Sequence, residues 1–597
     1  MTLTISLLGT AGAARDGKPV AGIRGHKAWA ILAYLLLAGA PVARQRLAAM
    51  FFPEAKDPSG ALRWNLSQLR RQLGVTIDGD PVVLTLPSDA RVDAHLLAHI
   101  DAGEAVALGG VGEDLLAGTW ADQSPAFEVW LEAERRHLRA LSADVLREAA
   151  LQRLAHGDHD EAVALAERVV GLEPLDENAA VLLVRALRAA GRGEEARSVV
   201  ASAEDRLRRE LGVEAGEALR SALHHRRGGT KHAGARLTIE ADREAGVAAL
   251  SAGAVDAGID LLREALGGAR ALDEPALIAS TLTDVASALI HAVRGADQDA
   301  TPLLHEVVSL HERVGDPALM ATAMRELGYV EMLRGRYPRA GVWFDRAAGF
   351  AGDDETQLAW IDTFSGAAQT DVADHPRAGR TLDEAVERAE AADSPPLQTM
   401  ARAMRGRLHL LTGDLDAAAV DLGQAFDLGT RHGLRSMLPW PATLRAEVDL
   451  RVGNVDGAAV QFQKAYATSQ QIGDPCWEAM ALRGLGLVAV DRGKLPEGVA
   501  HLDAAAAECR RLPDTYRWVE AYALDSLTAL GVHLDLEPTR GWARAFDELA
   551  TDHGMRQLSL HAARYRAALG EPGAETLLEQ RQQALIEVRD PREAGYR

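Results

Sequence analysis

A period of about 40 residues, which is typical of helical repeat proteins, runs through more than half of the chain. Seven turn segments, from GAVDAG to GKLPEG, each place a glycine or alanine at an equivalent point. These small residues recur at a nearly constant interval, at Gly258, Ala300, Ala340, Ala378, Ala418, Ala458 and Gly498. A second set of turns, such as LDEP and VGDP, falls between them, so each unit consists of a helix, a short turn, a helix and a longer turn. The period therefore predicts a helical repeat array.

One such repeat cannot bury its apolar face alone, so neighbouring repeats must stack into a right-handed superhelix with a concave inner surface. We expect the array over residues 237–570, with seven repeats and a degenerate eighth one past Leu530. On its concave surface we expect an unknown protein or small-molecule effector. Most large aromatic side chains at helical spacing belong to a core, so we expect at most two tryptophans to be exposed there. The candidates are Trp343, Trp360, Trp440, Trp477 and Trp518.

The same turn chemistry occurs earlier at a shorter spacing. The interval from Ala162 to Ala196 matches the tetratricopeptide period of about 34 residues, and each alanine follows a polar turn. The stretch HHRRGGTKHAGAR is basic and glycine-rich, as expected of a linker. These features predict a tetratricopeptide domain at 93–225, a linker at 226–236 and a C-terminal helix or tail at 571–597.

The first ninety residues have a different organisation. Strand segments surround a turn at Asp16-Gly17, and two helices follow, one ending at Gly39 and one running from Pro41 to Pro53. A third helix, ALRWNLSQLRRQLG, precedes a second hairpin around Asp78-Gly79. This order is that of a winged helix-turn-helix, which we place at 3–92. The predicted fold class is therefore mainly α, a small α+β winged helix-turn-helix followed by α-solenoid domains.

The third helix has one apolar and one polar edge. Successive residues are about 100° apart, so Leu62, Leu66, Leu69 and Leu73 form a narrow stripe that should pack on the first two helices. The other side should face the major groove of DNA, where arginine pairs with guanine, glutamine with adenine and serine with bases or phosphates. The candidate DNA-contacting residues are Arg63, Trp64, Ser67, Gln68, Arg70 and Arg71, with phosphate contacts from Lys27, Arg44 and Arg46.

The distribution of charge agrees with a nucleic-acid partner. The whole chain has a net charge of −21, yet its first 100 residues contain 11 Lys+Arg against 7 Asp+Glu. A small basic module on a large acidic body is expected where only the module touches a polyanion, because phosphate attraction is long-ranged and independent of sequence. Double-stranded DNA is therefore the predicted partner.

These motifs resemble the SARP-type bacterial transcriptional activators, which pair a response-regulator-type winged helix with a helical activator domain called BTAD. The first module carries the resemblance in GHKAWAILAYLLLAGAPVARQRLAAMFFP, ALRWNLSQLRRQLG and RVDAHLL, and the second in FEVWLEAERRHL, LEPLDENAAVLLVRAL and RLRRELGVEAGEALRSAL. It covers roughly residues 3 to 225 and implies activation by contact with RNA polymerase, as a dimer or tandem pair on direct repeats.

The chain departs from the family pattern in two places. The wing ends in VVLTL rather than an aromatic segment, and Asp78 and Asp80 bring negative charge to where a phosphate would approach. Ala215 stands where the family commonly has a proline. Larger relatives carry an ATPase before the repeats. Here Gly12 to Lys18 has phosphate-loop spacing, but Pro19 follows instead of serine or threonine, so we expect no nucleotide site.

Other site classes find little support. His156 to Asp160 falls on a turn between helices, and His95 and His99 have no clear third ligand, so we expect no metal and no cofactor. The sequence contains no nucleophile elbow, and we predict no enzyme activity. Two cysteines, Cys476 and Cys509, supply neither a disulfide framework nor a thiolate zinc site, and we interpret them as inert buried thiols.

The expected location is the cytoplasm. The N-terminal segment lacks the pattern of a signal peptide, and the apolar run AWAILAYLLLAGA is shorter than the roughly 20 residues that a helix needs to span a bilayer. A second hypothesis stays open beside the regulator. The acidic wing and the long array also suit a non-DNA-binding tetratricopeptide adaptor or scaffold with a degenerate winged helix.

Overall fold

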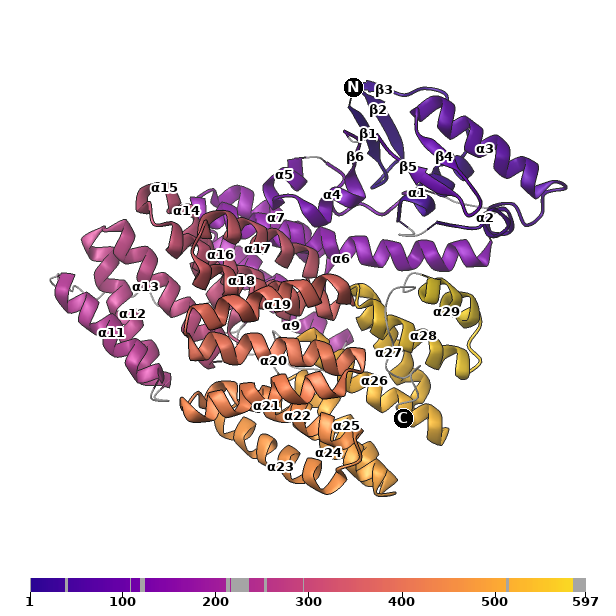
Figure 1. The fold of residues 1–597 in the computed structure, drawn as a ribbon. Coiled ribbons are helices and arrows are strands. Elements are labelled where there is room, and N and C mark those ends of the chain that lie inside the picture. The colour runs from indigo at the N-terminus through magenta and orange to yellow at the C-terminus, as the bar shows by residue number, and fades with distance from the viewer. Residues whose placement is uncertain are drawn as a thin grey trace. The chain divides into compact units, whose positions relative to one another are not determined.

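The computed structural model, drawn as a ribbon in Figure 1, divides into two compact units. The N-terminal unit comprises Met1–Ala150, Asp160–Leu219 and Pro572–Ile586, and the repeat unit comprises Leu151–His159, Arg220–Glu571 and Glu587–Arg597. The described residues are 2–37, 41–87, 89–107, 109–118, 124–210, 215, 219, 236–251, 255–293, 295–511 and 515–583. Gly39, nearly all of the predicted linker and most of the predicted tail lie outside them. The structure confirms the mainly helical fold class, with strands described only near the N-terminus.

A four-stranded sheet opens the N-terminal unit. Strands β1 (Leu3–Ser6), β2 (Gly12–Arg15) and β3 (Lys18–Pro19) are antiparallel, and β6 (Arg91–Val92) pairs parallel with β1. The register places Leu3 opposite Arg15 and Thr4 opposite Arg91. Asp16 and Gly17 have φ values of 49° and 77°, which a tight hairpin turn requires. The predicted turn is therefore confirmed.

Three helices and a wing follow in the predicted order. They are α1 (His26–Leu37), α2 (Arg44–Phe51), α3 (Pro58–Leu73), β4 (Thr76–Asp78) and β5 (Val83–Thr85), and β4 pairs antiparallel with β5. Helix α3 begins where the Asp57 carboxylate accepts a 2.8 Å hydrogen bond from Gly60 N, and it ends at Gly74, a left-handed cap. The prediction that the second helix starts at Pro41 is wrong, because Val42 forms a β-bridge with Val82 beside the wing.

The remainder of this unit is helical. It contains α4 (Asp93–His99), α5 (Ala102–Ala107), most of α6 (Pro125–His156), α7 (His159–Leu172), α8 (Glu177–Ala189) and α9 (Gly193–Glu210). Ala162 and Ala196 are fully buried, as the tetratricopeptide spacing requires. The C-terminal helix α29 (Ala574–Gln583) is grouped with this unit.

The winged helix is packed directly against the helices that follow it. The Asp93 carboxylate accepts hydrogen bonds from Leu7 N at 2.8 Å and Leu8 N at 3.0 Å, although burial raises its pKa. Two aromatic contacts join α1 and α2 to α6. The ring centres of Tyr34 and Trp130 are 4.8 Å apart, and those of Phe51 and Phe127 are 5.0 Å apart. Such ring contacts stabilise beyond their buried area. The candidate DNA-reading helices and the next domain therefore form one body.

The repeat unit is a succession of helical pairs. The pairs are α11 (Arg236–Ser251) with α12 (Val255–Leu272), α13 (Pro275–Ala288) with α14 (Asp297–Ser309), α16 (Pro317–Leu333) with α17 (Tyr337–Ala351), α18 (Glu355–Asp371) with α19 (His375–Ala391), α20 (Pro395–Thr412) with α21 (Leu415–Arg431), α22 (Pro439–Arg451) with α23 (Val455–Ile472), α24 (Pro475–Asp491) with α25 (Leu495–Cys509), and α26 (Arg517–Leu534) with α27 (Thr539–Asp552). The short α15 (His311–Val314) follows α14, and α28 (Arg556–Ala568) follows α27. The predicted seven repeats and a further eighth one are confirmed.

Gly-Asp-Pro turns in the sequence mark where one helix ends and the next begins. Before α16, Gly315 takes the left-handed conformation that closes α15. Asp316 then accepts a hydrogen bond from Leu319 N at 3.1 Å, and Pro317 occupies the first helical position, where its missing N–H costs nothing. The same arrangement precedes α24. Three adjacent residues thus end one helix and start the next.

All seven periodic small residues are buried, and the two glycines lie at the contact between paired helices. At Gly258 a Cβ atom would lie 2.9 Å from the carbonyl oxygen of Gly246 on α11. No larger side chain fits without separating the helices. The periodic glycines and alanines therefore permit close pairing.

The array curves until distant repeats meet. Arg556 Nε on α28 donates a 2.8 Å hydrogen bond to the carbonyl of Val372, 184 residues earlier. Tyr516, which precedes α26, donates to Asp371 of α18 at 2.9 Å. The inner surface of the array is thus partly covered by its own C-terminal helices.

The tryptophans named from the sequence and both cysteines are buried or partly buried. Trp343, Trp440 and Trp518 are at most 2% exposed, and Trp360 and Trp477 are partly buried, so the expectation that most are core residues is confirmed. Both cysteines are free and buried, and burial raises the pKa of the Cys509 thiol well above its ordinary value. Among the described residues, one helical stretch, Pro275–Val293, has the length and composition of a membrane span, but more than half of it is buried inside the protein.

Candidate DNA-contacting surface and a cavity in the repeat array

Helix α3 presents a mixed basic and aromatic edge to solvent. Its leucine stripe is at most 2% exposed, as predicted. On the opposite side, Arg63, Ser67 and Arg71 are exposed, and so is Trp64, with an exposed fraction of 58%. The side chain of Arg63 lies 3.9 Å from Asp57, an exposed contact of little energetic weight. These four predicted residues are therefore gathered on one accessible surface, called here the α3 edge.

Gln68 does not belong to this surface. Its side chain is buried, its Oε1 accepts a 3.0 Å hydrogen bond from Arg24 N, and its Nε2 donates to Arg24 O at 3.1 Å. The prediction that it faces outward is wrong, because a backbone segment before α1 covers that side of the helix. Gln68 instead holds this segment against α3.

Arg70 is directed at the wing. Its guanidinium donates through Nε to Ile77 O at 2.6 Å and through Nη2 to the same oxygen, and it lies 3.2 Å from the Asp78 carboxylate. The interpretation of Arg70 as a base contact is therefore wrong. Its charge offsets that of Asp78, one of the two acidic residues that distinguish this wing.

The three candidate phosphate contacts differ in environment. Lys27 is half-buried, with its ammonium 5.3 Å from the centre of the Phe52 ring. Arg44 donates through Nε to Gly79 O at 2.8 Å, and its backbone N–H donates to the Asp80 carboxylate at 2.9 Å. Arg46 is half-buried, with its Nη2 atom buried, and its charge lies near enough to the Tyr34 hydroxyl to oppose the rise that burial causes in the pKa of that group, so it is less accessible to a phosphate than predicted. Lys27 and Arg44 remain candidates.

The histidine clusters have local partners. His156 Nδ1 lies 2.7 Å from Gln152 O, and His95 Nε2 lies 3.1 Å from Leu36 O. The side chain of His99 is outside the described part of the chain. Within that part, no three His, Cys, Asp or Glu side chains come together as a metal site requires.

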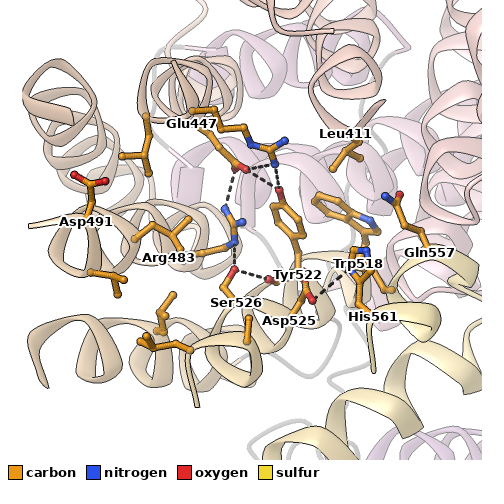
Figure 2. Close-up of a pocket in the computed structure, with 18 of the residues that line it drawn as sticks. Leu411, Glu447, Arg483, Asp491, Trp518, Tyr522, Asp525, Ser526, Gln557 and His561 are labelled. Atoms are coloured by element: carbon orange, nitrogen blue, oxygen red, sulfur yellow. Dashed lines mark hydrogen bonds and ion pairs between the residues drawn. The ribbon is translucent and has the colours of Figure 1, made fainter. Parts of the chain in front are cut away.

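The repeat unit contains a cavity of about 820 Å³ between the inner helices of its later repeats (Figure 2). Helices α18, α20, α22, α24, α25, α26 and α28 contribute to its wall. Of the tryptophans named from the sequence, Trp518 lines it. The charged residues of the wall were not predicted. Their signal was present, since an acidic or basic residue recurs inside otherwise apolar helices.

A buried charge cluster forms one side of this cavity. The carboxylate of Glu447 accepts hydrogen bonds from Arg451 at 2.7 Å, from Tyr522 at 2.7 Å and from Arg483 at 2.8 Å. Burial alone would raise the pKa of Glu447, but the charges of Arg483 and Arg451 outweigh it and lower the pKa to about 2. Arg483 also donates to Ser526 Oγ at 2.9 Å, and its guanidinium lies 3.7 Å from the centre of the Tyr522 ring. Glu447 is therefore ionised at neutral pH.

The same kind of pair recurs along the array. Four pairs with at least one buried member lie 35 or 36 residues apart and join successive repeats. They are His291 with Glu326, Asp371 with Arg407, Glu447 with Arg483, and Asp525 with His561. Sliding of one repeat along the next would separate the two members of a pair and leave a buried group without its partner. These pairs therefore oppose sliding between repeats.

The buried histidine His375, at the start of α19, should make the stability of the protein depend on pH. Burial and the nearby charge of Arg556 and Arg407 lower its pKa to about 4, against a smaller opposing effect of Asp374. Because the unfolded chain binds the proton at a higher pH, stability is complete above pH 6.5 and is lost as pH falls towards 4. Between pH 7 and 4.5, we expect the free energy of unfolding of the His375→Leu variant to fall by roughly 2 kcal/mol less than that of the parent.

Urea unfolding at both pH values, followed by circular dichroism, measures this difference. His432→Leu is the matched control, since His432 is an exposed histidine of the same array and should leave the pH dependence unchanged. Equal pH dependence in the parent and the His375→Leu variant would contradict the assignment.

Comparisons with known proteins agree with this architecture. Residues 88–226 match the model of the bacterial transcriptional activator domain, and residues 372–429 match that of a tetratricopeptide repeat. No curated protein sequence is a match. The fold and these matches define a helical-repeat protein with an N-terminal activator domain. The match to the bacterial transcriptional activator domain precedes the match to the tetratricopeptide repeat, in the order that the resemblance implied, and neither matched family is an enzyme family.

Several solved structures align with this chain at low sequence identity. A Rap protein complexed with competence and sporulation factor is 13% identical, with a TM-score of 0.45, over 59% of this chain and 100% of that one. EmbR of Mycobacterium tuberculosis, in complex with a low affinity phosphopeptide, is 20% identical, with a TM-score of 0.29, over 37% and 64%. Yeast Tom70 is 11% identical, with a TM-score of 0.30, over 76% and 96%.

Proposed function

We propose that this protein is a sequence-specific DNA-binding transcriptional regulator, an activator that recruits RNA polymerase. The observation that carries the proposal is the exposed α3 edge on a winged helix that is packed against an activator domain. The repeat array would sense a protein or small-molecule effector, and the protein would act in the cytoplasm, as a homodimer or tandem pair on direct repeats.

The α3 edge suits the major groove of DNA. Arg63, Ser67 and Arg71 follow one another at intervals of four residues, so they lie on one helical face over about 12 Å. Arginine can bond guanine through two nitrogens, and serine can bond a base or a phosphate. Trp64 adds an exposed apolar surface that suits the methyl group of thymine.

The wing is held in place to support this helix. Arg70 and Arg44 bond the wing backbone at Ile77 and Gly79, and Arg70 offsets the charge of Asp78. Two basic residues, Lys27 and Arg44, would contact phosphates on either side of the groove. The acidic residues of the wing are therefore compatible with DNA binding, and the proposed contact set is Lys27, Arg44, Arg63, Trp64, Ser67 and Arg71.

The test is selection of genomic fragments by the full-length protein, followed by titration of any enriched site at several salt concentrations. We expect a repeated motif, and a binding constant that falls with salt at a slope of about 2 to 4, since each neutralised phosphate contributes about 0.9. Absence of both an enriched motif and a salt-dependent affinity would reject DNA binding and favour the tetratricopeptide adaptor.

A further inference from the structure

We infer that the cavity of the repeat unit binds an amphipathic organic anion, a mainly apolar molecule whose single carboxylate is held by Arg483. A volume of about 820 Å³ is in the usual range for sites of small organic ligands. Much of the wall is apolar, which favours a hydrocarbon body. The leucine and valine residues of the wall are Leu411, Leu450, Leu487, Val490, Leu502, Leu530 and Leu558.

Three polar side chains in the wall have hydrogen-bonding capacity left over. Arg483 uses Nε and Nη1 for Ser526 and Glu447, and its Nη2 makes no hydrogen bond within the described chain. Within the same residues, neither the indole N–H of Trp518 nor the carboxamide of Gln557 has a hydrogen-bond partner. Gln557 is only 9% exposed and Arg483 only 5%, so both are buried groups of a built site.

All three residues line the cavity, and the ring of Tyr522 lies between Arg483 and Trp518. Figure 2 shows Arg483 at one side and Trp518 with Gln557 at another, on helices α24, α26 and α28. Two of the three groups can only donate, and the carboxamide can do so as well. A carboxylate therefore fits beside Arg483, where it accepts charge-assisted hydrogen bonds from the guanidinium.

The charge of the cluster selects an anion over a cation. Glu447 contributes one negative charge, and Arg451 and Arg483 contribute two positive charges, so the cluster has an excess of one positive charge. A buried excess charge is costly, and a carboxylate would offset it. The oxygens of Glu447 already accept three hydrogen bonds, which makes them poor partners for a ligand cation.

Of the other charged residues of the wall, Asp371 and Asp525 are buried in contacts of their own, and the remaining two are exposed. Asp371 is bonded to Arg407 at 2.6 Å, and Asp525 accepts a hydrogen bond from Tyr565 at 2.9 Å and lies 3.4 Å from His561. Asp491 and His533 are exposed. Arg483 is thus the wall residue best placed to meet an anion.

The inference names the ligand class for the effector-sensing part of the proposed function. It is tested without DNA, so its failure is distinguishable from a failure of DNA binding. Calorimetry on the full-length protein would compare decanoate, decan-1-ol and decyltrimethylammonium, each below its aggregation concentration. We expect saturable binding of one decanoate per chain, at least tenfold tighter than binding of the alcohol, and weaker binding still of the cation.

Arg483→Met removes the proposed anchor while Glu447 keeps Arg451 and Tyr522. We expect this variant to bind decanoate at least tenfold more weakly and the alcohol unchanged. The matched control is Arg445→Met, because Arg445 also lies over an aromatic ring, 4.9 Å from the centre of Phe426, but does not line the cavity. It should bind all three probes as the parent does.

A second variant keeps the test decisive if Arg483→Met does not fold. Ala529→Phe fills the cavity from a half-buried position on α26, and a folded Ala529→Phe protein should bind no decanoate. The inference is overturned if the parent shows no saturable decanoate binding, if it does not prefer the carboxylate, or if decanoate binding persists in Ala529→Phe.

Discussion

Replacing Arg63 and Arg71 together by alanine is expected to weaken binding to the selected DNA site by at least about 30-fold and to abolish the preference for its sequence. Each well-formed arginine contact with guanine contributes about 1 to 3 kcal/mol of discrimination, and about 1.4 kcal/mol is a factor of ten. Both side chains are exposed on α3, so their removal leaves the buried leucine stripe intact. Fluorescence anisotropy with the enriched site and a scrambled site measures both effects.

Two further variants make this result specific. Arg197→Ala removes an exposed arginine of α9 that pairs with its neighbour Glu194, so it lowers the positive charge without touching α3. It should keep sequence preference. Gln68→Ala should lower the stability of the winged helix, because it removes both hydrogen bonds to Arg24, but it should not change which base is preferred. Retention of the motif by the double arginine variant would contradict the assigned contacts.

Replacing Arg407 by methionine is expected to lower the free energy of unfolding of the array by about 3 to 5 kcal/mol. Arg407 and Asp371 are both fully buried, and the guanidinium donates to the carboxylate at 2.6 Å. The variant leaves the Asp371 carboxylate with the hydroxyl of Tyr516 but without a positive charge beside it. Urea unfolding at pH 7, followed by tryptophan fluorescence and circular dichroism, measures the loss.

A double variant identifies the cause of that loss. Arg407→Met combined with Asp371→Leu removes both charges, and we expect it to recover a large part of the stability, since apolar replacement of a whole buried pair is often neutral. Arg431→Met is the control, because this exposed arginine of α21 bonds a backbone carbonyl of its own helix. A double variant no more stable than Arg407→Met would show that packing, and not the unpaired charge, is responsible.

The repeat architecture could be predicted because its signals are local. Gly315, Asp316 and Pro317 end one helix and begin the next within three positions, and the small residues recur at a nearly constant interval. The leucine stripe of α3 was predicted for the same reason, since helical geometry alone places those residues on one side.

The direction of side chains at the border of a helical face could not be predicted in this way. Gln68 and Arg70 both flank the exposed edge of α3, but one is covered by the backbone at Arg24 and the other reaches the wing at Ile77. Arg46 is likewise partly covered, with its Nη2 atom buried beside Tyr34. In each case a neighbouring segment decides which polar group is exposed, and the helical pattern does not contain that information.

The sequence by itself determined the order of the elements, the helix boundaries marked by turns, the repeat period and the exposed arginines of α3. These depend on residues close together in the chain or on a regular interval. Only the tertiary structure decided which charges are buried together and where the cavity lies. Those features arise where the array curves back on itself and joins residues such as Val372 and Arg556, 184 positions apart, through contacts that no local pattern encodes.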